Sequence, residues 1–94
     1  MREPLVSITR CANNEWKNSV YPAVREAMEK IGGMETVVSA GDTVLLKPNC
    51  LFPVSYETGA VTNPAVIEAV VELVKEAGAK RVIIADGAAV GRNT

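Results

Sequence analysis

The sequence contains no histidine and only two cysteines, Cys11 and Cys50, which lie far apart and form no CxxC pair. A zinc ion or an iron–sulfur cluster needs about four ligands, and two thiols cannot supply them. Cys11 and Cys50 are therefore only weak candidates for metal ligands, and the remaining ligands would have to come from elsewhere. Free cysteines are more often small buried fillers, so packing is the favoured interpretation of both.

Positive and negative charges are nearly balanced, because the sequence contains 10 Lys and Arg residues and 11 Asp and Glu residues, which gives a net charge of −1. The basic residues are scattered, which gives no electrostatic footprint for nucleic acid or for an anionic membrane surface. The start, MREPLVSITR, lacks the apolar core of a signal peptide, and no run approaches the roughly 20 apolar residues of a membrane span. We expect a cytoplasmic protein that binds neither nucleic acids nor membranes.

The apolar residues that are present follow an alternating order of strands and helices. Short β-prone runs occupy residues 5–9, 43–47 and 80–86, and helical spacing covers residues 19–31 and 64–77. This β-α-β-α-β order predicts an α/β fold with three parallel strands and two crossover helices, as part of a larger three-layer sheet. The strands read as near-continuous apolar runs, as expected for strands covered on both faces.

Capping residues mark the ends of the predicted helices. Ser19 can cap the first helix, and the pair of glycines at 32–33 stops it. Thr62 or Asn63 can cap the second helix, with Pro64 in its first position.

The chain of 94 residues predicts a single α/β domain over residues 1–94. Two helices can hardly cover both faces of a three-stranded sheet. We therefore expect the chain to be the N-terminal fragment of a longer protein, or to be covered by self-association.

Candidate site residues follow the second predicted strand, where the carboxyl ends of parallel strands form a ligand-binding edge. Lys47 offers a positive charge to a phosphate or carboxylate, and Asn49 offers one donor and one acceptor. The alternative is that Lys47 is a solvated lysine at a strand end and Asn49 a turn former beside Pro48.

Three further candidates belong to the same predicted edge. Asp86 and Gly87 follow the third strand, either as a ligand-binding or metal-binding carboxylate with its turn, or as an ordinary turn dipeptide. Thr62 stands at a helix start whose free N–H groups could receive an anion, although capping explains it equally well.

Three stretches together resemble the domain-of-unknown-function family 362. They are VYPAVREAMEKIGG, GDTVLLKPNCL and TGAVTNPAVIEAVVELVKEAGAKRVIIADG. The resemblance implies a cytoplasmic α/β protein of roughly three times this length, of which some members carry ferredoxin-like cysteine clusters toward the C-terminus. It also implies that the family's motif residues are those at the matching positions here: Lys47, Pro48, Asn49, Thr62, Pro64 and Asp86.

Three functions fit these observations. The first is the α/β portion of a cytoplasmic redox or small-molecule-binding protein associated with an iron–sulfur cluster and electron transfer, with the cluster in the full-length protein. The second is an enzyme in which Lys47 holds a phosphate or carboxylate ligand and Asp86 acts as a base or binds Mg²⁺. The third is a non-enzymatic interaction or scaffold module that binds a partner through an uncovered sheet face.

Overall fold

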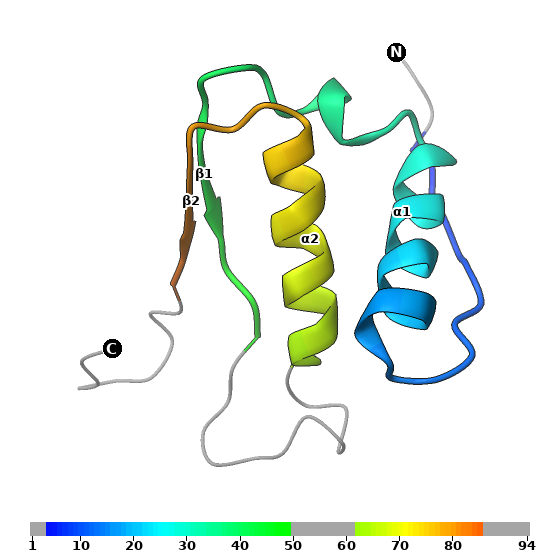
Figure 1. The fold of residues 1–94 in the computed structure, drawn as a ribbon. Helices are drawn as coiled ribbons and strands as arrows, with labels where there is room; N and C mark the ends of the chain where they lie inside the picture. Colours follow the sequence, from blue (N-terminus) through cyan, green and yellow to red (C-terminus); the bar gives the residue numbers. More distant parts are fainter. Residues whose placement is uncertain (1–3, 50–61, 86–94) are drawn as a thin grey trace.

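A computed structural model of the protein describes the structure of residues 4–49 and 62–85. Its elements, in chain order, are the π-helical turn η1 (Trp16–Val20), helix α1 (Tyr21–Glu29), the 3₁₀ turn η2 (Met34–Thr36), strand β1 (Thr43–Leu46), helix α2 (Pro64–Glu76) and strand β2 (Arg81–Ile84). Figure 1 shows the strands, α2 and α1 side by side as three successive layers, with α2 in the middle.

The described strands form one parallel pair. Thr43 lies opposite Arg81 and Leu46 opposite Ile84, and α2 is the crossover between the two strands. The N–H of Ala85 donates to the carbonyl oxygen of Leu46 at 3.0 Å, which extends the ladder by one bond. The α/β class and the parallel pairing are as the sequence predicts, and both strands are close to their predicted ranges.

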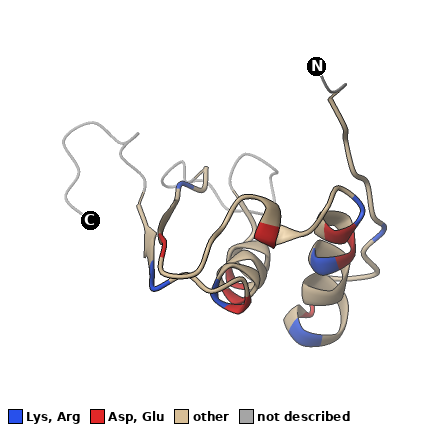
Figure 2. Ribbon diagram, turned by 90° about the horizontal axis from the view of Figure 1, so that it is seen from above, with Lys and Arg blue, Asp and Glu red and all other residues tan. Residues whose placement is uncertain are grey.

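The core lies on the apolar face of α2, between the strands and α1. Three of its residues, Ala69, Leu73 and Val74, are buried, and Val20 and Val38 join them from the segments on either side of α1. All three α2 residues belong to the apolar residues at positions 66, 69, 70, 73, 74 and 77, which helical spacing gathers on one face of α2. This one helix therefore packs against both neighbouring layers (Figure 2).

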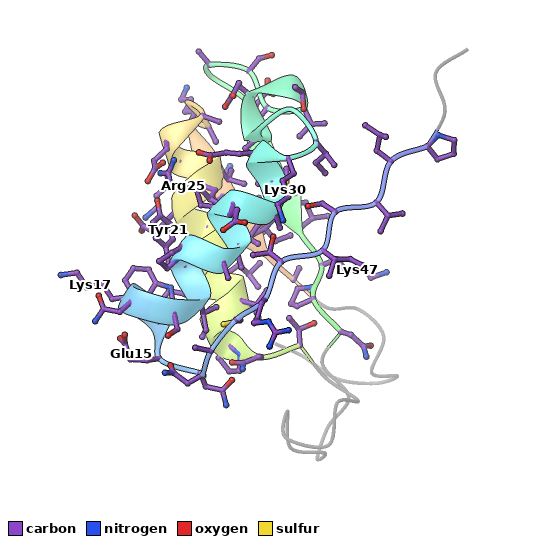
Figure 3. The ribbon with its side chains drawn as sticks, turned by 90° about the vertical axis from the view of Figure 1, so that its right-hand side faces the viewer. Glu15, Lys17, Tyr21, Arg25, Lys30 and Lys47 are labelled. Carbon is purple, nitrogen blue, oxygen red and sulfur yellow. The ribbon has the colours of Figure 1, made fainter. Side chains whose placement is uncertain are left out.

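The strand predicted at residues 5–9 is not found. This segment is extended but has no strand partner among the described residues, and the side chains of Val6 and Ile8 are 85% and 81% exposed. It runs beside α1, where Lys30 Nζ donates to the carbonyl oxygen of Ile8 at 2.9 Å (Figure 3). β-Propensity produces a strand only where a neighbour completes the ladder, and α1 and α2 separate this segment from β1.

Only one face of the described sheet is covered. Val44 and Leu46 are half-buried, whereas Leu45 is 61% exposed and its partner Ile83 is also exposed. Both helices lie on the same side, so the expectation of strands covered on both faces is not met by the described residues (Figure 2).

The first helical segment begins earlier than the sequence predicts. Glu15, not Ser19, is its N-cap, because the Glu15 carboxylate accepts hydrogen bonds from the N–H groups of Lys17 at 3.0 Å and Asn18 at 2.7 Å. Aspartate, asparagine, serine and threonine are the usual N-caps, which explains why the glutamate was missed. The end is as predicted: Gly33, at a φ of 88°, donates its N–H to the carbonyl oxygen of Met28 at 2.8 Å.

Candidate functional site at the end of β1

The chain leaving β1 and the start of α2 are joined by two reciprocal hydrogen bonds. The N–H of Asn49 donates to Thr62 Oγ1 at 3.0 Å, and the N–H of Thr62 donates to the carbonyl oxygen of Asn49 at 2.7 Å. These bonds bring two candidate residues together although 13 positions separate them. The carboxyl end of β1 and the amino end of α2 therefore form one local structure.

Lys47 lies immediately before this junction. Its side chain is exposed and extends away from the ribbon in Figure 3. It takes part in no ion pair or hydrogen bond with any other residue in 4–49 or 62–85. Its ammonium group is thus available on a flexible four-carbon stem.

A pocket of about 180 Å³ lies between the end of β1 and the first turns of α2. Apolar side chains make up most of its wall. Its lining residues are Leu46, Lys47, Pro48, Thr62, Val66, Ile67 and Val70.

The start of α2 does not offer its backbone N–H groups to a ligand. Asn63 Oδ1 accepts from the N–H of Ala65 at 2.9 Å, and the Asn63 carbonyl oxygen accepts from Val66 at 2.9 Å and from Ile67 at 3.3 Å. Pro64 has no N–H to donate. Of the two residues proposed as the cap, Asn63 is the one that fills this role, and an anion here would depend on side chains.

The remaining candidates do not assemble a metal centre in the described structure. The Cys11 thiol is exposed and donates to the carbonyl oxygen of Asn13 at 3.1 Å. Cys50, Asp86 and Gly87 lie outside the described residues. Within residues 4–49 and 62–85, no group of three or more His, Cys, Asp or Glu residues is arranged to hold a metal ion, so this part of the chain does not fit an iron–sulfur cluster.

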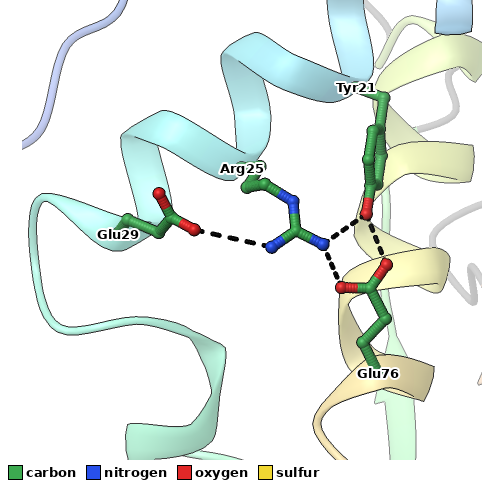
Figure 4. Close-up of polar contacts among 4 residues, drawn as sticks. All are labelled: Tyr21, Arg25, Glu29 and Glu76. Atoms are coloured by element: carbon green, nitrogen blue, oxygen red, sulfur yellow. Dashed lines mark hydrogen bonds and ion pairs between the residues drawn. The ribbon is translucent and has the colours of Figure 1, made fainter.

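A second polar cluster joins α1 to α2 and was not predicted. The Tyr21 hydroxyl donates to the Glu76 carboxylate and accepts from Arg25 Nη2 at 2.7 Å, while the same Arg25 nitrogen also pairs with Glu76 (Figure 4). Arg25 also lies over the Tyr21 ring, 5.3 Å from its centroid, and pairs with Glu29 at 3.5 Å. Tyr21, Arg25 and Glu29 follow one another at intervals of four residues, and this spacing indicates the contacts within α1. The contacts with Glu76 have no such signal in the sequence.

The cluster shifts the titration of both charged groups. The hydrogen bond from Tyr21 is the main cause that lowers the pKa of Glu76 below its ordinary value of 4.5, and the bond from Arg25 adds to it. The hydrogen bond to Tyr21, followed by that to Glu76, raises the pKa of Arg25. Ionised Glu76 is therefore favoured in the folded state.

This shift predicts a pH-dependent contribution to stability. Because the folded-state pKa of Glu76 lies below 4.5, its stabilising effect is complete above that pH and disappears as the pH falls through the lowered pKa. We expect Glu76→Gln to lower the free energy of unfolding at pH 7, and this difference from the unaltered chain to shrink below pH 4.5. Urea unfolding at a series of pH values measures it.

The control for this prediction is Tyr21→Phe, which removes the hydroxyl that contributes most to the shift while keeping the ring. The contribution of Glu76 to the free energy of unfolding should then be smaller, and its loss should be complete at a higher pH than in the unaltered chain. A difference between Glu76→Gln and the unaltered chain that stays constant from pH 7 to pH 3 would contradict the assignment.

The junction at the end of β1 lies within a stretch of recognisable sequence. A family model described as "Domain of unknown function (DUF362)" matches residues 44–94. A curated relative, the thylakoid-associated protein sll1697 of Synechocystis sp., is 41% identical over 75 residues, which make up 80% of this chain and 23% of that protein. The chain thus spans about a quarter of that relative, and no solved structure matches it.

Within residues 4–49 and 62–85, no helix combines the length and the apolar character that crossing a bilayer requires.

Proposed function

Because the chain belongs to the DUF362 family, we propose that it supplies a binding site for a small anionic ligand within a larger redox protein. The observation that carries the proposal is the exposed Lys47, which pairs with no other described residue, beside a pocket at the carboxyl end of β1. Open α/β sheets bind their ligands at this edge. In this proposal Lys47 supplies the positive charge, Asn49 and Thr62 hold the two segments together, and Asp86 and Gly87 complete the site from the end of β2.

The redox part of the proposal concerns the longer protein. The described residues do not fit an iron–sulfur cluster, so any cluster is held elsewhere, in keeping with a relative of which this chain spans about a quarter. Cytoplasmic localisation belongs to the proposal as well. The relative is named a thylakoid-associated protein, so the alternative is a similar association, and cell fractionation distinguishes the two.

The proposal predicts that Lys47→Ala weakens the binding of inorganic phosphate or acetate to the chain at least about tenfold, the size of one charge-assisted hydrogen bond. The matched control is Lys80→Ala, which removes the same charge from an exposed residue next to the amino end of β2. Isothermal titration at low salt measures both. Equal weakening by the two substitutions would show that general charge, not this site, attracts the anion.

A second function, an interaction module, is favoured by the uncovered apolar face of the sheet. Leu45 and Ile83 lie opposite each other on that face, and both are exposed. Further parts of a longer protein, or a second copy of the chain, would cover it. We expect the isolated chain to bind an apolar-surface dye and Leu45→Ser to reduce that binding, whereas a monodisperse monomer that binds no dye would count against this function.

A further inference from the structure

We propose that the ligand of the site at the end of β1 is a small monocarboxylate with an apolar body, not a bare inorganic anion. The inference rests on the proposed function and specifies its ligand class. It comes from the contrast between the wall of the pocket and the polar groups at its edge.

The wall is suited to hydrocarbon. Leu46, Pro48 and three residues of the first turns of α2 (Val66, Ile67 and Val70) supply apolar surface along the pocket. A volume of about 180 Å³ equals that of about six water molecules at ~30 Å³ each, which suits the body of a four- to six-carbon acid. Removing such a body from water is favourable by an amount proportional to its apolar area.

Two hydrogen-bond donors lie at the edge of this wall. The flexible stem of Lys47 allows its ammonium group to turn over the pocket. Thr62 Oγ1 already accepts from the N–H of Asn49, and no described residue accepts its hydroxyl proton, so that proton is free for a ligand oxygen. One ammonium and one hydroxyl match the two oxygens of a carboxylate.

A phosphate is a poorer match for the same surroundings. It carries more charge and more acceptor oxygens, and phosphate sites usually add backbone N–H groups at a helix start. Here the N–H groups of Ala65, Val66 and Ile67 are already bonded to Asn63. A multiply charged anion without these donors would also lose hydration against an apolar wall.

The experiment titrates the ¹⁵N-labelled chain with isovalerate, acetate, inorganic phosphate and the neutral isovaleramide, and follows the backbone amides by NMR. Isovalerate should shift the amides of Leu46, Lys47, Val66 and Val70. Its Kd should be at least tenfold lower than that of acetate, because each buried methylene is worth about fourfold in affinity. Isovaleramide should bind at least about tenfold more weakly than isovalerate.

Two substitutions separate the parts of the site. Lys47→Ala should raise the Kd of isovalerate at least about tenfold, whereas Lys80→Ala should not change it. Val66→Thr replaces one methyl group of the half-buried Val66 by a hydroxyl, which makes the pocket wall more polar and keeps its shape. This substitution should raise the Kd of isovalerate but not that of acetate. Well-dispersed spectra confirm that each variant is folded. If Val66→Thr does not fold, Val70→Ala provides a second substitution in the apolar wall of the pocket.

Each remaining outcome overturns the inference in a distinguishable way. If phosphate or acetate binds at Lys47 as tightly as isovalerate, the apolar body is irrelevant and only the proposed anion site stands. If isovaleramide equals isovalerate, the pocket takes apolar groups without using Lys47. If none of the four compounds shifts these amides, both the inference and the proposed function are wrong.

Discussion

Leu73→Ala is expected to lower the free energy of unfolding by about 2–4 kcal/mol, the usual cost of removing a buried leucine side chain and leaving a cavity. Leu73 is 5% exposed and lies on the face of α2 that forms the core. A domain of this size has little stability to spare. Thermal and urea unfolding followed by circular dichroism should therefore show a clearly lower melting temperature and a clearly lower urea midpoint than in the unaltered chain.

The matched control is Leu45→Ala, the same chemical change on the uncovered face of the sheet, where the side chain is 61% exposed. It should change the free energy of unfolding by less than about 1 kcal/mol. Similar losses for the two leucines would mean that the uncovered face is buried in solution and that the core is placed wrongly.

Gly78→Ala is the second substitution with a large expected effect. Gly78 ends α2 with a φ of 109°, which costs a residue with a Cβ about 1–2 kcal/mol. The added Cβ would also lie 3.0 Å from Ala40 Cα, a backbone atom that cannot move aside without shifting the loop before β1. We expect a total loss of at least about 2 kcal/mol in the free energy of unfolding, from the φ cost plus this overpacking.

Gly41→Ala isolates the backbone cost from the steric one. Gly41 has a φ of 89°, but nothing lies within 4 Å of the Cβ that the substitution would add. Gly78→Ala should be clearly more destabilising than Gly41→Ala in the same urea experiment. If the two are equal, the close approach between the end of α2 and Ala40 is absent in solution.

The parts of the fold that the sequence predicted are those decided by local patterns. The apolar spacing of α2 places Ala69, Leu73 and Val74 on one face, and their packing against neighbours confirms it. Asn63 before Pro64 marks the start of this helix because the cap bonds are made within three residues. Strands β1 and β2 are apolar runs bounded by turn residues, and they pair in parallel as expected.

What the sequence could not predict depends on contacts between distant segments. Residues 5–9 have the composition of a strand, yet no described neighbour pairs with them. At helical spacing, Glu76 shares one polar stripe of α2 with Glu68, Glu72 and Lys75, but the packing of α1 on α2 brings it to Tyr21 and Arg25. For the candidate site, position after a strand identified Lys47 and Asn49, whereas the apolar pocket beside them forms only where the first turns of α2 lie next to the end of β1.

The most direct test of the anion site is to locate where the chain binds an anion. The ¹⁵N-labelled chain, titrated with acetate at low salt, should show its largest amide shifts at residues 46–49 and 62–67, on both sides of the Asn49–Thr62 junction. Shifts centred on Lys80 and Arg81, or spread evenly over the exposed lysines and arginines, would contradict a ligand site at the end of β1.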